Sequence, residues 1–361
     1  MKIAIIGAGL SGLSCAHELE RYGISPDVYE DLDFIGDREP HVTAVLEIIE
    51  RPMFDVLNYF KQKCHLDIKP HNTIKKLTHN APNIKRVVKG SNLGYFFMRG
   101  KSEQSVKQQI YRQLKHPHIL FGKKPDYKEL AKAYDFVVIA NGCPEITKAL
   151  GCWEELISGW VKGAIVQGDF NTQELILWIN RKYCKNGYAY LTPVSNREAS
   201  LLLFIPHVDK AGIDYYWSRF FEVENLQYGI IEEFSIEHFS GAVYPHKVDN
   251  IYLVGGAGGA ISPFLGFGQV NSITMGVLAA QSMVEGLDFE KLIKRFVGKN
   301  NSLYEFRKAF NGLSNKGFHN IINFVTLPII KQLIYYTRFN VVKYSAWALE
   351  LKNKIFFELK K

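Results

Sequence analysis

The first thirty residues constrain this chain more than any other segment. A short aliphatic stretch at residues 3–6 leads directly into three glycines, spaced G-x-G-x-x-G, within residues 7–12. A helical pattern covers residues 10–21, and a second apolar stretch at 28–30 ends in an acid. This order predicts a strand, a tight turn, a helix and a second strand, which together are typical of a dinucleotide site.

Each part of this segment has a physical role in holding a dinucleotide. Gly7 allows the tight turn, Gly9 lets a pyrophosphate approach the backbone, and Gly12 lets the helix pack close to the strand. The free N–H groups at the start of the helix favour phosphate. Glu30 is suited to accept hydrogen bonds from ribose hydroxyls and would repel a 2′-phosphate. The residues expected to contact the nucleotide here are Gly7, Ala8, Gly9, Leu10, Ser11, Gly12, Glu30, Asp31 and Arg38. The alternative is a glycine-rich turn in an ordinary α/β domain, and the motif by itself does not separate FAD from NAD.

Length and composition narrow the class of protein. A chain of 361 residues can bury a large core and is expected to hold two domains, or one domain with an insertion. The 24 Phe, 19 Tyr and 5 Trp favour an apolar or ring-shaped ligand. The five cysteines form no C-x-x-C pair, so neither a zinc site nor a disulfide framework is expected. Because the chain starts with a strand pattern rather than a signal peptide, a cytoplasmic setting is expected.

The apolar segments near residues 3, 28, 136 and 251 predict the strands of one parallel sheet. Between them lie segments rich in short strands, which predict an inserted antiparallel sheet. Helices are expected at 42–50, 54–63, 102–115, 214–221 and 269–285. The fold class is therefore α/β, with a Rossmann-type parallel sheet, an inserted antiparallel sheet and a helical C-terminal segment. The expected nucleotide domain comprises 1–70, 100–155 and 245–300, the substrate sheet 71–99 and 156–244, and the helical segment 301–361.

A second glycine-rich turn lies at residues 255–268, between a strand and a helix. It holds six glycines in fourteen residues. Glycine lets the backbone approach a flat or phosphorylated ligand closely, and the positive end of the following helix would stabilise a ring that gains negative charge. A mobile loop is the alternative interpretation.

These motifs resemble the flavoprotein family that contains the geranylgeranyl reductases. In that family an N-terminal G-x-G-x-x-G followed by an acid binds the ADP half of FAD. A later segment reads V-G-D-A-A-G-x-x-D-P-x-x-G-x-G, and residues 254–268 follow it. Residues 275–280 resemble the helix that comes next, 95–99 the strand that ends in an arginine, 140–151 an A-D-G segment, and 188–193 a degenerate Y-G-W-x-F-P segment of the substrate sheet.

The resemblance implies FAD as cofactor and carries further site residues with it. The implied cofactor contacts are Arg99, Asn141, Gly142, Gly255, Gly256, Gly266, Phe267, Gly268 and Gln269. The implied substrate pocket holds Tyr188, Tyr190 and Pro193. Three departures stand out: Gly256 and Asn141 replace acids of the family pattern, and Tyr190 replaces its Trp. No catalytic residue and no metal ligand is assigned.

Basic character concentrates at the C-terminal end. The chain has a net charge of +8, and residues 301–361 alone hold ten Lys or Arg against three Asp or Glu. Residues 318–330 carry no Lys, Arg, Asp or Glu, but this stretch is too short to span a membrane. Amphipathic helices are expected here, either as a cap on the core or as helices on an anionic membrane surface. Nucleic-acid binding is not expected, because large aliphatic residues are interleaved with the basic ones.

The function expected from these observations is an FAD-dependent oxidoreductase that reduces or oxidises carbon–carbon bonds of a lipophilic, isoprenoid-like substrate. Because there is no second G-x-G-x-x-G, the electron donor is expected to be a transiently bound NAD(P)H or a protein carrier. Two alternatives remain open at this stage. One is an FAD-dependent aromatic monooxygenase, and the other is a flavoprotein or lipid-binding protein with a degenerate site.

Overall fold

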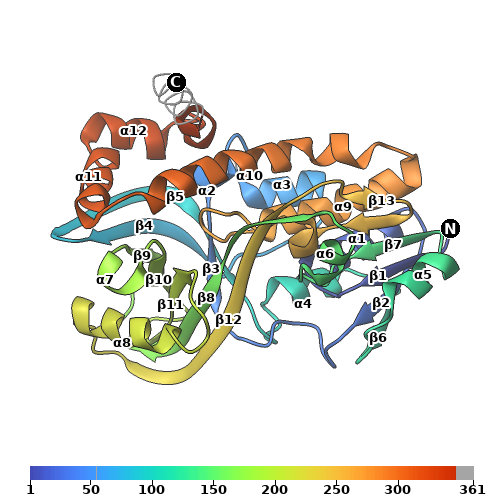
Figure 1. Cartoon of the computed structure of the whole chain (residues 1–361), viewed down its shortest axis with the longest axis horizontal. Helices are drawn as coiled ribbons and strands as arrows, with labels where there is room; N and C mark the ends of the chain where they lie inside the picture. The colour runs from blue at the N-terminus through green and yellow to red at the C-terminus, as the bar shows by residue number, and fades with distance from the viewer. Residues whose placement is uncertain (54, 347–361) are drawn as a thin grey trace.

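The computed structural model describes residues 1–53 and 55–346, which form two sheets with helices packed around them (Figure 1). The first sheet has six strands in the order β13-β14-β7-β1-β2-β6. Its strands are β1 Ile3–Ile6, β2 Asp27–Glu30, β6 His118–Phe121, β7 Phe136–Ile139, β13 Lys247–Val248 and β14 Ile251–Leu253. The second sheet has eight strands in the order β12-β8-β11-β10-β9-β4-β5-β3. Its strands are β3 Val42–Leu46, β4 Asn72–Ala81, β5 Ile84–Met98, β8 Trp153–Gln167, β9 Glu174–Trp178, β10 Tyr188–Pro193, β11 Glu198–Pro206 and β12 Gly229–Val243.

The helices are mostly short in the first half of the chain and longer near its C-terminal end. They are α1 Leu10–Arg21, α2 Glu47–Glu50, α3 Val56–Lys63, α4 Val106–Tyr111, α5 Tyr127–Ala133, α6 Glu145–Ala149, α7 Arg181–Cys184, α8 Ile213–Glu224, the 3₁₀ turn η1 Gly255–Gly258, α9 Gln269–Glu285, α10 Phe289–Asn311, α11 Asn315–Val325 and α12 Pro328–Tyr336.

The six-stranded sheet confirms the predicted parallel α/β core. Strand β1 pairs in parallel with β2 and β7, and β14 pairs in parallel with β7. All four residues of β1 are buried, as expected for a strand covered by helices on both faces. Ile6 lies opposite Ile139, which lies opposite Leu253, so the carboxyl ends of these three strands stop at one level.

Helices α1 and α9 cover one face of this sheet. Helices α1 and α9 have the bounds that the sequence patterns predict. They approach so closely at Gly276 that a Cβ atom there would lie 2.1 Å from the carbonyl oxygen of Ser11. This contact fixes α1 and α9 relative to each other, although the two helices are far apart in the sequence.

The predicted inserted antiparallel sheet is also present, with one parallel pair between β4 and β9. Its two faces pack against different parts of the molecule. On one face, Leu201 and Leu203 of β11 pack with Trp217 and Phe220 of α8. On the other face, Tyr188 and Phe204 form a smaller cluster against Leu265, which belongs to the second glycine-rich turn. The second face therefore positions the sheet over the end of the parallel sheet.

The helix expected at residues 42–50 is wrong over most of its length. Val42–Leu46 is strand β3, which pairs antiparallel with β5, and only Glu47–Glu50 is helical. The strand is apolar on both faces, since Ala44 packs with one core cluster and Val45 with another. A short apolar run without alternation does not distinguish a buried strand from a helix. The helices expected at 54–63 and 102–115 are present but shorter, and residue 54 lies outside the described residues.

The C-terminal segment is largely helical, as predicted: α10, α11 and α12 reach residue 336, and residues 341–346 are helical too. It runs along one side of the molecule (Figure 1). The boundary expected at residue 300 falls inside α10. Residues 347–361, which include several of the basic residues of the tail, lie outside the described residues. Within the described part, no helix has the length and apolar character needed to cross a bilayer.

Two buried histidines should make stability depend on pH. Burial lowers the pKa of His79 to about 4, and burial together with the nearby Arg99 guanidinium lowers that of His41 to about 4. In the unfolded chain these imidazoles protonate near pH 6.5. The unfolded state therefore binds more protons between about pH 6.5 and 4, and stability should fall as the pH drops through this window.

Urea unfolding at pH 7 and pH 5 checks this expectation. We expect a lower free energy of unfolding at pH 5, and a smaller decrease in the H41Q/H79Q variant. The exposed His116 supplies the control, since H116N should leave the pH dependence unchanged. Equal stability at the two pH values in the unmodified protein would contradict the burial account.

Candidate functional site

Three turns that are distant in sequence meet at the carboxyl ends of β1, β7 and β14. These strands are neighbours in the sheet, and they lead into residues 7–12, 140–142 and 255–258. In open parallel sheets, ligands bind outside this end of the strands. The structure therefore brings the two predicted glycine-rich turns into one place, with the Asn141 turn between them.

The glycines of the first turn divide into two that are needed for packing and one that leaves space. Gly7 has φ +105°, and a Cβ atom there would lie 2.6 Å from the carbonyl oxygen of Ala140. A Cβ atom at Gly12 would lie 1.9 Å from the carbonyl oxygen of Gly7. At Gly9, by contrast, the nearest atom to a Cβ would be the Ala140 oxygen at 3.4 Å. Gly9 is therefore not required by the protein's own packing, which fits the expected approach of a pyrophosphate to this backbone.

The start of α1 is open to an anion. Its N-cap residue is Gly9, which provides no side-chain hydrogen bond, and the first turn of the helix holds no acid. The N–H groups at a helix start carry a partial positive charge, and here no side chain caps them. Leu10 and Ser11 lie in this first turn, and the Ser11 side chain is buried under Gly255. These features fit a nucleotide phosphate.

Glu30 lies beside the same turn. Its carboxylate accepts hydrogen bonds from the N–H groups of Ala8, at 2.7 Å, and Leu32, at 2.9 Å. These bonds fix an acid at the tip of β2, next to the glycine turn, where the ribose contact is expected. The neighbouring residues Asp31 and Arg38 are exposed, and Nη2 of Arg38 lies 4.0 Å from Oδ2 of Asp31.

An ion-pair cluster fixes the loop that follows Glu30. Arg99 donates to Asp37 through Nε at 3.1 Å and Nη2 at 2.5 Å, and Lys107 of α4 lies 2.9 Å from the same carboxylate. Burial alone would raise the Asp37 pKa, but the two cations outweigh it and hold the pKa well below its usual range. Lys107 also donates to the carbonyl of Gly36. Arg99, expected to contact the cofactor, therefore also anchors this loop.

The second glycine turn packs directly against the other two turns. A Cβ atom at Gly255 would lie 2.3 Å from the Ser11 hydroxyl, and one at Gly256 would lie 2.5 Å from the carbonyl oxygen of Gly142. Gly256 is the position where the reductase pattern has an acid. With Gly142 in its present place, no side chain fits at residue 256. The glycine is thus part of how these turns pack.

The end of the second turn reaches the substrate sheet. Gly268 is the N-cap of α9 and provides no side-chain cap, and Gln269 donates to the Thr43 hydroxyl of β3. Tyr188 donates its hydroxyl to the carbonyl of Leu265, and a Cβ atom at Gly266 would lie 2.9 Å from the ring of His238. Phe267 packs against the core cluster under β4 and β5.

The predicted substrate residues lie on one strand beside this turn. The rings of Tyr188 and Tyr190 stack with centroids 6.1 Å apart. Burial raises the pKa of the Tyr188 hydroxyl well above its usual range and that of Tyr190 to about 12. Both hydroxyls therefore stay protonated near neutral pH. Pro193 is buried at the end of β10. Tyr188 and Tyr190 therefore face the second glycine turn, whereas the backbone of Pro193 pairs with Ala199.

Sequence reasoning missed Arg307, the largest of the fully buried side chains. It donates to the carbonyl of Asn186, but its Nε and Nη1 atoms are buried without a hydrogen-bond partner. Burial lowers its pKa to about 10, and its charge helps to lower that of His238 to about 4. The sequence offered only one signal, which is a basic residue on the otherwise apolar buried face of a helix.

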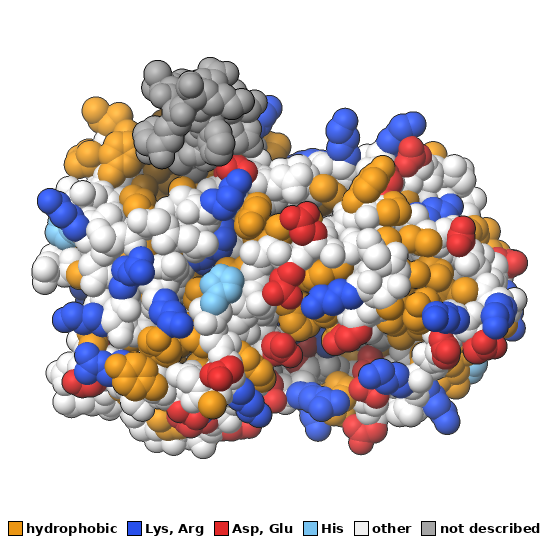
Figure 2. Space-filling view, in the orientation of Figure 1, with side chains coloured by type: hydrophobic (Ala, Val, Ile, Leu, Met, Phe, Trp, Pro, Cys, Tyr) orange, Lys and Arg blue, Asp and Glu red, His pale blue; other side chains and the backbone are white. Residues whose placement is uncertain are grey.

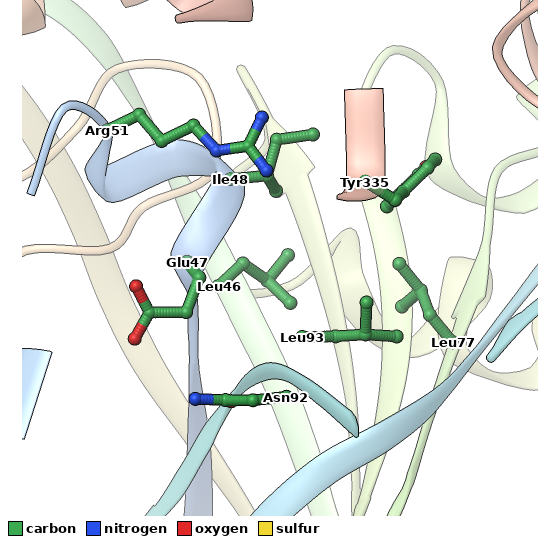
Figure 3. A pocket seen from close by; sticks show the side chains of 8 residues that line it. All are labelled: Leu46, Glu47, Ile48, Arg51, Leu77, Asn92, Leu93 and Tyr335. Atoms are coloured by element: carbon green, nitrogen blue, oxygen red, sulfur yellow. The ribbon is translucent and has the colours of Figure 1, made fainter. Parts of the chain in front are cut away.

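Two cavities lie away from the glycine turns. One, of about 30 Å³, is enclosed between Leu46, Leu77, Leu93 and Tyr335 (Figure 3). The other, of about 540 Å³, lies between residues 50–53, α10 and residues 340–344. Among the described residues, no group of three or more His, Cys, Asp or Glu side chains is placed to hold a metal ion.

The fold and the site together define a protein with a Rossmann-type nucleotide-binding domain joined to an antiparallel sheet. Residues 5–89 match the model of the NAD(P)-binding Rossmann-like domain. No curated protein sequence matches the chain.

Solved structures share the whole architecture. A geranylgeranyl bacteriochlorophyll reductase-like protein from Thermoplasma acidophilum is 15% identical with a TM-score of 0.72, covering 96% of this chain and 94% of that one. A flavin-dependent brominase is 14% identical with a TM-score of 0.66 and full coverage of both chains. The enzyme 2-methyl-3-hydroxypyridine-5-carboxylic acid oxygenase is 12% identical with a TM-score of 0.59, covering 95% of this chain and 97% of that one. At these identities the likeness establishes the fold, which is the one that the resemblance to the reductases implied.

The contact at Gly256 predicts the effect of a side chain there. G256A should lower the free energy of unfolding by about 1–3 kcal/mol, because the methyl group overlaps a backbone oxygen that packs from a neighbouring turn. Urea unfolding measures this. Gly312 is the control, since a Cβ atom there would lie 3.6 Å from its nearest neighbour. A G256A protein as stable as the G312A protein would show that the turns do not pack as described.

The unpaired nitrogen atoms of Arg307 predict that its replacement by an apolar residue does not destabilise the protein. Because a buried charge without an acid is costly, R307M should leave the thermal unfolding midpoint unchanged or raise it. R99M removes a partner of the half-buried Asp37 and should lower the free energy of unfolding by up to about 3 kcal/mol. An R307M protein that is as destabilised as R99M would show that the Arg307 guanidinium has a stabilising partner.

Proposed function

We propose that this protein is an FAD-dependent oxidoreductase. The observation that carries the proposal is the meeting of two glycine turns, from residues 7–12 and 255–268, at the carboxyl ends of neighbouring parallel strands. The flavin-dependent proteins with the same fold support the choice of FAD over NAD alone. The residues present also fit this cofactor, because Gly9 leaves space and the starts of α1 and α9 are both uncapped by side chains.

Each part of the site would take a different part of FAD. Gly9 and the first turn of α1 would hold the pyrophosphate, and Glu30 the ribose of the adenosine half. Gly266 to Gln269 would lie along the ring, with the start of α9 favouring negative charge on it. When bound, FAD supplies hydride and electron transfer. The chain's own contribution is to orient the ring and exclude water from the face under β10.

For the substrate, we propose a lipophilic molecule with a polar end. Tyr188, Tyr190 and Phe204 provide an aromatic surface beside the second glycine turn. Tyr188 and Tyr190 keep their protons at neutral pH and could hold or deliver a proton there. Arg307, which is buried with two unpaired nitrogen atoms and interacts electrostatically with Tyr188, suits an anionic or carbonyl end of the substrate.

Reduction or oxidation of a carbon–carbon bond is the reaction we favour, with NAD(P)H or a protein carrier as electron donor. Support comes from the fold shared with the reductase-like protein and from the apolar surroundings of Tyr188. Aromatic hydroxylation is the second candidate, because an oxygenase shares the fold.

Anaerobic reduction of the flavin distinguishes the two reactions, when isoprenoid is then added to one sample and oxygen with an aromatic acid to another. Reoxidation by the isoprenoid supports the reductase, and hydroxylated product supports the oxygenase.

The cofactor proposal is tested by the visible spectrum of protein purified after incubation with FAD. We expect flavin bands in the unmodified protein and at least a tenfold weaker affinity in G9A, because the added methyl group occupies the space left for the pyrophosphate. Since that methyl group meets only an oxygen at 3.4 Å, the G9A protein should remain folded.

The matched control is G298A, on the exposed side of α10, where a Cβ atom meets nothing within 4 Å. It should retain FAD and gain up to about 1 kcal/mol of stability. A colourless unmodified protein that takes up no FAD, with the fold intact by circular dichroism, would refute the proposal and favour a degenerate site.

A further inference from the structure

One face of α11 and α12 presents large apolar side chains to solvent. Figure 2 shows this patch in orange at the upper left, over α11 and α12. The exposed fractions are 41% for Ile321, 55% for Phe324, 44% for Leu327, 83% for Ile329, 39% for Leu333 and 40% for Tyr336. The spacings of three and four residues place them on one side of each helix. We call these six residues the α11–α12 face.

The opposite sides of the two helices are firmly held. Phe318 and Ile322 of α11 are buried. Tyr335 of α12 packs against the core cluster of the sheet that contains Leu77 and Leu93, and lines one small cavity with them (Figure 3). Its hydroxyl lies 3.2 Å from Nε2 of His79.

Polar contacts fix the ends of the helices as well. Arg86 donates to Asn323 at 3.0 Å, and Arg51 donates to the carbonyls of Ile334 and Phe339 at 2.7 and 2.8 Å. The orientation of the helices is therefore set by partners on the inner side. Tyr336 also reaches inward, since its hydroxyl donates to the carbonyl of Lys89. These contacts leave the other five residues of the α11–α12 face exposed.

The charged residues in this segment of the chain have one sign. No Asp or Glu occurs between Glu305 and Glu350, a stretch that includes α11 and α12. The same stretch holds the basic residues Arg307, Lys308, Lys316, Lys331, Arg338 and Lys343. Apart from the buried Arg307 and the half-buried Lys331, these side chains are exposed. Each Lys or Arg near an anionic membrane contributes about 1 kcal/mol of attraction.

A basic cavity lies at the same end of the molecule. Its volume is about 540 Å³, and Arg51, which holds α12, is part of its lining. Arg295, Lys299 and Lys343 line it together with the apolar Met53 and Phe296. Lys299 is paired with Glu50 at 2.5 Å. This mixture of cations and apolar wall suits a phosphate group that is attached to an apolar chain.

We propose that the α11–α12 face docks on the surface of an anionic phospholipid bilayer. Helices with a strongly apolar side and basic neighbours lie in the plane of the interface. A second copy of the chain is disfavoured as the occupant, because it would bring two acid-free basic segments together. The proposal stands without the cofactor, although a membrane site would also give a lipophilic substrate a short path to the protein.

Co-sedimentation of the full chain with vesicles tests this proposal. Vesicles of phosphatidylcholine alone are compared with vesicles that contain one part phosphatidylglycerol to two parts phosphatidylcholine. We expect binding to the anionic vesicles, weaker binding at high salt, and little binding to phosphatidylcholine. The F324S/I329S variant should bind the anionic vesicles at least tenfold more weakly, because it removes two exposed apolar side chains.

The matched control is Y215S/I230S, which removes two exposed apolar residues from α8 and β12. It should bind like the unmodified protein, and all variants should keep their thermal midpoint because the substituted side chains are exposed. Equal binding by F324S/I329S, or no binding of the full chain to anionic vesicles, would overturn the proposal. A dimer that depends on Phe324 and Ile329, with no vesicle binding, would assign the face to a second copy. FAD content, measured on the same samples, separates this result from failure of the proposed function.

Discussion

The close packing of backbone on backbone at the ends of β1, β7 and β14 is the constraint on which the site depends. Gly7 packs against Ala140, Gly12 against Gly7, and Gly256 against Gly142, at distances that leave no space for a Cβ atom. Such contacts need glycine at both early and late positions of the chain. They bring the starts of α1 and α9 to one edge of the sheet, and thereby place two helix dipoles on the same side. The antiparallel sheet then covers this edge through Tyr188 and Leu265.

The same packing explains why residue 256 is a glycine, where the reductase pattern has an acid. An acid at residue 256 would collide with Gly142 while the turn at residues 140–142 and the second glycine turn keep their present places. Whether or not the cofactor proposal holds, the glycine is explained by the protein's own packing.

Much of this arrangement could be predicted from sequence, because its signals are local. The bounds of α1 and α9 follow from glycine spacing and helical periodicity, and four strands of the parallel core follow from four apolar segments, although their order in the sheet does not. Strand β3 was mistaken for a helix because both of its faces are buried, so the alternation that marks a strand is missing. Arg307 could not be found, since its significance arises only when α10 buries it and leaves two of its nitrogen atoms without a hydrogen-bond partner. The pairing of Arg99 with Asp37 likewise depends on tertiary contacts between a strand end and a loop.

The central claim is that two turns some 250 residues apart form one nucleotide site. Hydrogen exchange, followed by mass spectrometry with and without FAD, measures this directly because it reports each segment separately. The account predicts that FAD slows exchange in residues 7–12 and 30–32 and, at the same concentrations, in residues 255–269. Protection confined to the first turn, with the second unchanged at saturating FAD, would contradict it.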